Sequence, residues 1–289
     1  MLCRPTSTLR PEKRPESAVP ESTRGPVHRT DSAVVSAVKL LRGAERRKTG
    51  RFLVEGENAV AEALIAGPVH ELFFTEQAAE RYPHLIERAV ADGVRGSLVT
   101  DRAIRALSDT VTPPGVVAVC DLLDVPLATA VTSRTRLLAV PVAIGEPGNA
   151  GTVIRVADAV GADAAILAGD SVDPHNGKCV RSSAGSLFHI PIVRERNVDA
   201  VLDALTSAGI QILATAADGE VDLDDADDLL ARPTAWLFGN EAHGLDAAVA
   251  RRADHRVRIP IRGRAESLNL ATAASICLYA SARVQGRQS

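Results

Sequence analysis

Short apolar runs alternate with amphipathic stretches along most of the chain. Runs such as residues 137–144 and 234–238 are apolar and bounded by glycine or polar residues, which is typical of buried strands. The intervening stretches, for example residues 197–208, repeat apolar residues three and four positions apart, as an amphipathic helix does. This alternation predicts an α/β fold in which a parallel sheet is covered by helices on both faces.

The same pattern divides the chain into four parts. Residues 1–30 are rich in Pro, Ser, Thr, Glu and Arg without apolar periodicity, so we expect a flexible tail. Residues 31–125 alternate short strands and helices and predict a small α/β domain. Residues 126–136 are the expected linker, and residues 137–289 form a second domain of longer elements. The predicted helices include residues 57–66, 81–92, 101–107, 149–160 and 267–284.

Composition narrows the class of protein only slightly. The 33 Lys and Arg against 36 Asp and Glu give a net charge of −3, so any nucleic-acid site has to be a local basic patch. The four cysteines lack metal-ligand spacing, which predicts no metal site and fits a reducing compartment. No apolar run approaches the roughly 18 residues of a membrane span, and the start has no apolar signal segment. We expect a soluble cytoplasmic protein.

The loop after the run at residues 137–144 combines a sharp turn with an unexpected cation. Pro147 and Gly148 predict the turn, and Asn149 is the expected N-cap of the next helix. Arg155 then falls in the second helical turn, where a cation gains nothing from the helix dipole. An ion pair with Asp158 would explain it, and a functional role is the alternative.

Two later loops could meet the first one. In a parallel sheet, the loops after the carboxyl ends of the strands converge on one crevice. The loop after residues 234–238 has two glycines and offers Asn240 and Glu241, although a plain turn would also use such residues. In the last loop, Ser267 is the expected N-cap of the closing helix and Asn269 falls in its first turn. We expect these polar side chains to face the crevice.

A basic cluster follows the first predicted helix, at residues 32–41. Its members are Arg42, Arg46, Arg47, Lys48 and Arg51. Cations also suit a helix C-terminus, so a solvated basic face and a nucleic-acid contact both remain open.

Three segments in order resemble the motifs of a known family. They are Asn149-x-Gly151-x-x-x-Arg155, the residues Leu-Phe-Gly-Asn-Glu at 237–241, and Ile-Pro-Ile at 259–261 leading to Ser-Leu-Asn at 267–269. Together they resemble the SpoU (TrmH-like) RNA ribose 2′-O-methyltransferases over residues 137–285. Residues 178–191 resemble the segment between the first two motifs, and residues 52–116 resemble the family's smaller RNA-substrate-binding domain. Within the family, the chain is most similar to the ribosomal RNA enzymes typified by the thiostrepton-resistance methyltransferase.

The resemblance implies an S-adenosylmethionine-dependent enzyme that methylates a ribose 2′-hydroxyl of RNA. It implies 23S ribosomal RNA as substrate, with transfer RNA as the alternative, and a homodimer joined through a C-terminal domain that contains a deep trefoil knot. The implied cofactor residues are Thr215, Ala216, Phe238, Gly239, Asn240, Ile259 and Leu268. The implied catalytic residues are Arg155, Asn149, Glu241, Ser267 and Asn269. Arg181 would grip the RNA backbone, and Arg46, Arg47, Lys48 and Arg51 would hold RNA phosphates.

Two other classes of protein remain as alternatives. A nicotinamide-dependent oxidoreductase would share the α/β alternation, but the chain lacks the Gly-x-Gly-x-x-Gly of a dinucleotide site and the Gly-Lys-Ser/Thr of a phosphate loop. A non-catalytic RNA-binding protein of ribosome assembly could keep the same fold. The presence of all three motifs favours the enzyme.

Overall fold

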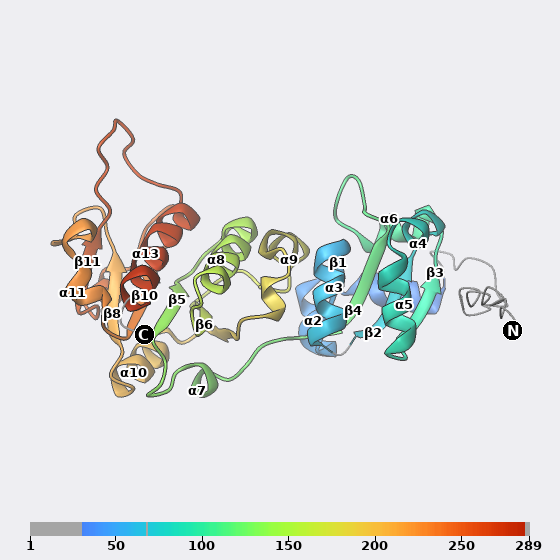
Figure 1. The fold of residues 1–289 in the computed structure, drawn as a ribbon, viewed down its shortest axis with the longest axis horizontal. Helices are drawn as coiled ribbons and strands as arrows, with labels where there is room; N and C mark the ends of the chain where they lie inside the picture. Colours follow the sequence, from blue (N-terminus) through green and yellow to red (C-terminus); the bar gives the residue numbers. More distant parts are fainter. Residues whose placement is uncertain (1–30, 68, 287–289) are drawn as a thin grey trace, which may run out of the picture.

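The computed structural model describes residues 31–67 and 69–286, so the tail expected at residues 1–30 lies outside the described residues. The described chain forms two sheets that lie side by side, each with its own helices (Figure 1).

The first sheet is mixed. Its strand order is β1-β4-β2-β3, with β4 antiparallel to β1 and β2, and β3 parallel to β2. The strands are β1 (Arg51–Glu55), β2 (Val69–Phe74), β3 (Arg95–Leu98) and β4 (Val116–Asp121). The helices are α1 (Ser32–Lys39), α2 (Gly43–Thr49), α3 (Glu57–Ala66), α4 (Glu76–Arg81), α5 (Pro83–Ala91) and α6 (Asp101–Leu107).

One predicted helix of this domain begins two residues later than expected. A helix was expected at residues 81–92, but Arg81 ends α4, a separate helix that was not predicted, and α5 begins at Pro83. Proline has no backbone N–H and its ring disfavours a helical conformation in the preceding residue, here Tyr82. Tyr82 accordingly leaves the helical region, with φ −126° and ψ 51°.

The second sheet has seven strands, all parallel, in the order β7-β6-β5-β10-β8-β11-β9. Its strands are β5 (Leu137–Pro141), β6 (Ala164–Ala168), β7 (Ile192–Glu195), β8 (Gln211–Thr215), β9 (Val221–Asp222), β10 (Thr234–Phe238) and β11 (His255–Arg258). Its helices are α8 (Pro147–Ala159), α9 (Gly177–Ser183), α10 (Val198–Ser207), α11 (Asp227–Leu230), α12 (Ala247–Ala250) and α13 (Leu270–Gln285), with short 3₁₀ turns η1 (Ser186–Phe188) and η2 (Leu223–Asp225).

Helices cover both faces of this sheet, which confirms the predicted architecture. Successive residues of a strand point to opposite faces. In β10, Trp236 packs in the apolar cluster that contains α8 and α13, whereas Leu237 packs in the cluster that contains α10. Trp236 is fully buried, and its indole N–H donates to Ser281 of α13 at 2.9 Å.

The order of the strands changes direction between β5 and β10. From β5 the chain runs outward through β6 to β7, and then returns to build β8, β10 and β11 on the other side. Such a switch point opens a crevice at the carboxyl ends of the strands. The loop after β5 and the loop after β10 therefore meet.

Both helices beside this crevice begin at residues other than the predicted ones. Asn149 was expected to cap α8, but α8 begins at Pro147, with the Glu146 side chain accepting the Gly148 N–H. Ser267 was expected to cap α13, but Asn269 is the cap and its side chain accepts the N–H groups of Ala271 and Thr272. Proline suits the first position of a helix because the N–H it lacks would have no helical partner there.

Apolar packing joins the two domains directly. The Phe52 ring of β1 lies edge-on to His175, with centroids 4.6 Å apart, and stacks on Phe188 at 6.3 Å. The expected linker, residues 126–136, contains the helix α7 (Leu127–Ala130), which contacts β7. Among the described residues, no helix has the length and apolarity needed to cross a membrane.

Candidate functional site

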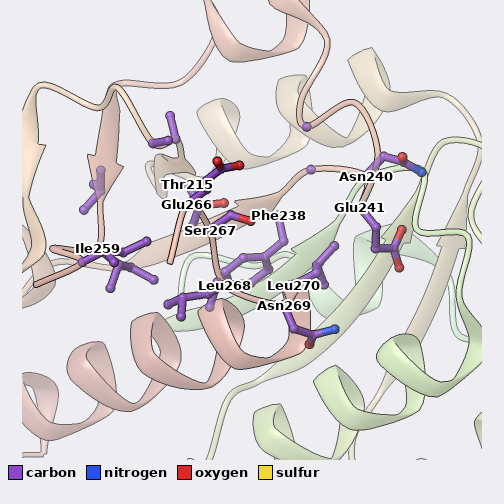
Figure 2. A pocket seen from close by; sticks show the side chains of 17 residues that line it. Thr215, Phe238, Asn240, Glu241, Ile259, Glu266, Ser267, Leu268, Asn269 and Leu270 are labelled. Atoms are coloured by element: carbon purple, nitrogen blue, oxygen red, sulfur yellow. The ribbon is translucent and has the colours of Figure 1, made fainter. Parts of the chain in front are cut away.

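A cavity of about 530 Å³ opens at the carboxyl ends of β10, β8 and β11. Its lining contains all seven residues expected to hold the cofactor: Thr215, Ala216, Phe238, Gly239, Asn240, Ile259 and Leu268. It also contains three of the five expected catalytic residues, Glu241, Ser267 and Asn269 (Figure 2). The cavity is therefore formed by the loops after β8, β10 and β11.

The loop after β10 folds back on itself at the cavity wall. Asn240 and Gly244 exchange backbone hydrogen bonds of 2.9 and 2.8 Å. A Cβ atom at Gly239 would lie 2.3 Å from the backbone of Gly244 and Leu245, so only glycine fits there. The glycine of this motif thus closes the turn.

The Asn240 side chain makes hydrogen bonds to the backbone of two loops, the one after β5 and its own loop after β10. Its amide Nδ2 donates to the Ala143 carbonyl at 2.7 Å, and its Oδ1 accepts the Ala242 N–H at 2.9 Å. Ala143 has a positive φ of 53°, which costs energy for a residue with a Cβ and is tolerated where neighbours fix the backbone. Asn240 therefore holds the loop after β5 against the loop after β10.

A polar cluster lies at one end of the cavity, on the side away from Ile259 (Figure 2). Asn149 Nδ2 donates to Glu241 Oε1 at 3.0 Å, and Asn269 Nδ2 donates to Asn149 Oδ1 at 3.1 Å. Each of these residues comes from one of the three sequence motifs. The cluster thus links the loop after β5, the loop after β10 and the N-terminus of α13.

Glu241 is held as a carboxylate. Partial burial opposes its ionisation, but hydrogen bonds from the Asn149 amide and from backbone N–H groups, including those of Gly145 and Glu146, lower its pKa below the ordinary value. A carboxylate stabilised in this way is a weak base. The hydrogen bond that Glu241 accepts from the Asn149 amide lets this carboxylate orient Asn149.

Arg155 does not join this cluster. Six residues of helix separate it from Asn149, a rise of about 9 Å and a rotation of about 120° away from it. Arg155 is exposed and makes no hydrogen bond or ion pair with the described residues. The ion pair considered with Asp158 is absent, because Asp158 pairs with His189 at 3.0 Å.

The first motif glycine has a packing role that spacing alone did not reveal. A Cβ atom at Gly151 would lie 2.0 Å from Ser182 Oγ and 2.4 Å from the Cys179 carbonyl oxygen. Helices α8 and α9 therefore touch at backbone distance. This contact places Arg181 and its neighbours beside α8.

The basic cluster separates into buried and exposed members. Arg46 was expected to hold a phosphate, but it is only 4% exposed, pairs with Asp173 at 2.7 Å and donates to the carbonyls of Leu40 and Leu41. Four of its five N–H groups are therefore used inside the protein. Arg47 and Lys48 are exposed, as is Arg51, whose Nε lies 3.7 Å from Asp121.

Arg181 pairs with carboxylates of the first domain. Its Nη1 donates to Glu55 Oε2 at 3.1 Å and also to Asp109 Oδ1. The described residues contain no group of three or more His, Cys, Asp or Glu side chains that could hold a metal ion.

Seven further residues line the cavity that were not among the expected cofactor or catalytic residues. They are Ala217, Gly244, Val257, Ile261, Glu266, Leu270 and Ala273. Most are apolar or small, and such residues at strand and helix ends look like ordinary core positions. Only Glu266, beside Ser267 in the last loop, carried a polar signal.

The sheet, the cavity and the polar cluster together are typical of an α/β protein that binds a small organic cofactor. A parallel α/β sheet carries a cofactor-sized cavity at its carboxyl edge, bordered by a polar cluster. The first N–H groups of α13, which could otherwise bind a phosphate, are occupied by the Asn269 side chain. The site therefore fits a small organic cofactor without a phosphate group.

Comparison with known proteins identifies the family. Residues 136–279 match the SpoU rRNA Methylase family, and residues 53–126 match the RNA 2′-O ribose methyltransferase substrate binding domain. The chain is 38% identical over 242 residues to the 23S rRNA (guanosine(2553)-2′-O)-methyltransferase of Bacillus subtilis, covering 83% of this chain and 92% of that enzyme. The chain belongs to the SpoU rRNA methylase family, which confirms the resemblance of its motifs.

Further similar proteins agree. The 23S rRNA (uridine(2479)-2′-O)-methyltransferase of Streptomyces viridochromogenes is 34% identical over 250 residues, covering 84% of this chain and 87% of that enzyme. A SpoU methyltransferase from the same organism, solved in complex with the cofactor AdoMet, superposes with a TM-score of 0.77 at 34% identity and covers 90% of this chain and 99% of that one. An AdoMet-bound rRNA methyltransferase from Sinorhizobium meliloti superposes with a TM-score of 0.78 at 32% identity. The match covers 88% of this chain and 95% of that one.

Proposed function

We propose that this protein is an S-adenosylmethionine-dependent RNA 2′-O-ribose methyltransferase that acts on 23S ribosomal RNA. The observation that carries the proposal is that the polar cluster and the cavity share two residues. Glu241 and Asn269 line the cavity, and both bond to Asn149. A methyl donor in the cavity would present its methyl group beside side chains that can orient a hydroxyl.

The cavity fits the proposed cofactor. Its volume of about 530 Å³ lies within the range of roughly 300–1,000 Å³ that is usual for small-molecule sites. Val257, Ile259 and Leu268 offer apolar walls for an aromatic base. Glu241 and Glu266 supply negative charge, which suits a cofactor that carries a sulfonium and an amino group. We assign all seven expected cofactor residues to this role, with Asn240 contributing through the shape of its loop.

The cofactor supplies an electrophilic methyl group, and the chain's own residues prepare the hydroxyl. The Asn149 amide is fixed at both ends, by Glu241 on its nitrogen and by Asn269 on its oxygen. Holding a hydroxyl in line with a reacting group can supply several kcal/mol of barrier reduction. We therefore assign Asn149, Glu241, Asn269 and Ser267 to positioning the 2′-hydroxyl.

We further propose a homodimer through the second domain in which Arg155 serves the site of the other copy. Its exposed position and its separation from Asn149 support this role, because the arginine does not reach the cluster of its own chain. The α13 side chains Ile276 and Tyr279 are 37% and 65% exposed and offer an apolar surface for the partner. A guanidinium stays protonated, so Arg155 would orient a phosphate or hydroxyl.

Mixing two inactive variants tests this arrangement. Arg155→Ala subunits and Asn269→Ala subunits should each fail to transfer methyl groups alone. After mixing and exchange of subunits, about a quarter of the wild-type sites should be intact, since half of the dimers are mixed and each has one complete site. If methyl transfer does not recover although subunit exchange is verified, Arg155 does not serve the site of the other subunit.

We also propose that the second domain contains the deep trefoil knot. From β11, near the sheet edge, the chain returns to its centre, where α13 contacts β5, β10 and α8 (Figure 1). Threading a helix through a loop requires slim segments, and Ala271, Ala273, Ala274 and Ser275 provide one.

The first domain is proposed to bind the RNA. Arg47, Lys48 and Arg51 are exposed on it and can contact phosphates, while proteins that read RNA sequence engage loops and splayed bases. We propose that residues 31–125 are the RNA-binding domain, residues 126–136 the linker and residues 137–289 the catalytic domain. We also propose that the enzyme works in the cytoplasm.

Methyl transfer from tritium-labelled S-adenosylmethionine tests the function. The acceptors are ribosomal RNA and, separately, transfer RNA from cells lacking this protein. Label in a 23S ribose is the expected result. Label only in transfer RNA would keep the chemistry and change the substrate, and cofactor binding without transfer to either RNA would favour a non-catalytic RNA-binding protein.

A further inference from the structure

An arginine of the second domain is paired with two carboxylates of the first. Arg181 lies on α9, and its Nη1 donates to both Glu55 and Asp109. One guanidinium thus faces two carboxylates, and the three-residue group has an excess negative charge. A phosphate could not join this group without strong repulsion unless one carboxylate left it.

Glu55 is the fixed member of the pair. Its side chain is 7% exposed. While Oε2 binds Arg181 at 3.1 Å, Oε1 accepts hydrogen bonds from the hydroxyls of Ser108 and Thr110. Removing this carboxylate would break hydrogen bonds from three donors, Arg181, Ser108 and Thr110. Glu55 therefore orients Arg181 and stays in place.

Asp109 is the exchangeable member. Its side chain is 43% exposed, and among the described residues Arg181 is its only ion-pair partner. The two residues that flank it, Ser108 and Thr110, are tethered to Glu55. A rotation of the Asp109 side chain would therefore free Arg181 while the loop stays bound.

Space for an anion exists where the Asp109 carboxylate lies. A Cβ atom at Gly177 would be 3.1 Å from Asp109 Oδ2 and 3.2 Å from Arg181 Nη1. The bare backbone of Gly177 thus borders the position of the carboxylate and leaves it open. Because Asp109 is exposed, a phosphate group that takes the place of its carboxylate can extend into solvent.

This position connects to the polar cluster. Arg181 is one helical turn from Lys178, whose Nζ bonds to Glu146 at 2.6 Å. Glu146 precedes α8 and donates its N–H to Glu241. A strand of RNA that crosses from Arg181 to Lys178 therefore runs toward the cavity.

We propose that Asp109 occupies the place of an RNA phosphate on Arg181 in the free protein, and that a substrate phosphodiester displaces it. Glu55 keeps the arginine oriented for the exchange. The swap replaces one monoanion by another, so the charge of the group is unchanged. The proposal rests on the proposed RNA methyltransferase function and adds a gate to its RNA-binding surface.

The test measures binding of labelled 23S rRNA, taken from cells lacking this protein, in a filter assay at several salt concentrations. Asp109→Asn keeps the shape of the side chain and removes the competing charge, so its Kd should fall about two- to fivefold, the strength of an exposed ion pair. Arg181→Ala should weaken binding and reduce the salt slope by about one. In the Arg181→Ala background, Asp109→Asn should change nothing.

Matched controls separate the gate from a general effect of charge. Asp228→Asn removes another exposed charge, on α11 at the end of the second domain that lies away from α9 (Figure 1), and should leave the Kd unchanged. Asp109→Ser is measured in parallel, so that a folding defect in one variant, detected by thermal unfolding, does not decide the result. An equal gain with Asp228→Asn, a gain that persists without Arg181, or unchanged or weaker binding by both folded Asp109 variants would overturn the proposal.

Methyl transfer by the same samples separates this proposal from the function on which it rests. A wild-type protein that binds the RNA without methylating it would overturn the proposed reaction and leave the exchange at Arg181 to be judged by the binding data. A wild-type protein that methylates the RNA, with no gain from the Asp109 variants, would overturn the exchange alone. Absence of RNA binding in every variant would overturn both.

Discussion

The side-chain amide of Asn149 lies 3.0 Å from the carboxylate of Glu241, although 92 residues separate them in the chain. They meet because β5 and β10 are neighbours in the sheet, so the loops that follow these strands share one edge. The backbone N–H groups of Gly145 and Glu146 bond to the same carboxylate. Glu241 thereby fixes the loop after β5 as well as the side chain of Asn149.

Asn269 has two roles that substitution can separate. Its Oδ1 caps α13, and its Nδ2 holds Asn149. Asn269→Ala should lower the free energy of unfolding by about 1 kcal/mol, the usual cost of losing a cap. Asn269→Ser should keep the cap and the stability, but it is too short to hold Asn149. Methyl transfer should fall by about 100-fold in both variants, since misplacement of a positioning group has effects of this size. Full activity of Asn269→Ser would show that only the cap matters.

Arg155→Ala should nearly abolish methyl transfer while cofactor binding and stability stay unchanged. Arg155 is exposed and makes no ion pair with the described residues, so its loss leaves no buried group without a partner. Thermal unfolding, equilibrium binding of the cofactor and tritium transfer check the three parts. Arg196→Ala is the control, because Arg196 is 89% exposed and lies away from the cavity lining. Wild-type transfer by Arg155→Ala would remove this residue from the reaction.

Members of the basic cluster should respond differently to substitution. Arg46→Ala removes a buried guanidinium that bonds to Asp173 and to the carbonyls of Leu40 and Leu41, although Arg194 still pairs with Asp173, and should destabilise the fold by about 1.5–3 kcal/mol. The double variant Arg47→Ala, Lys48→Ala should keep the stability and weaken RNA binding, with a smaller dependence on salt. Urea unfolding and filter binding at several salt concentrations measure the two effects. A stable Arg46→Ala protein with weakened RNA binding would restore the role expected from the sequence.

The contact of His189 with both domains predicts a dependence of stability on pH. Its Nε2 lies 3.0 Å from Glu62 of α3, and its Nδ1 lies 3.0 Å from Asp158 of α8. Hydrogen bonds to Glu62 and then to Asp158 raise the pKa of His189 above its ordinary value of 6.5. The stabilisation is therefore complete below about pH 6.5 and is lost as the pH rises through the raised value.

Comparison with His189→Gln measures this contribution. At about pH 6 the variant should be less stable than the wild type by about 0.5–1 kcal/mol, as expected for exposed ion pairs. At about pH 9 the two proteins should unfold at nearly the same urea concentration. A difference that is equal at both pH values would show that the charge of His189 contributes nothing.

The sequence by itself determined most of the helices and strands, and the resemblance of its motifs pointed to ten of the residues at the cavity. Burial of alternate and helically spaced apolar residues is a local pattern, so strands such as β10 (Thr234–Phe238) and helices such as α3 (Glu57–Ala66) were predicted with their observed bounds. The parallel sheet then placed three separate loops at one edge. All seven expected cofactor residues accordingly line the cavity.

Only the tertiary structure decided which polar side chains are free and which are already paired. Arg46 and Arg47 are neighbours with equal charge, yet one is buried against Asp173 and the other is exposed. Asn149 and Arg155 belong to one motif, yet Asn149 bonds to Glu241 and Asn269, whereas Arg155 makes no hydrogen bond or ion pair with the described residues. The reason is physical: Asp173 and Glu241, the partners of Arg46 and Asn149, lie 127 and 92 positions away from them in the chain, and a local pattern carries no information about such distant contacts.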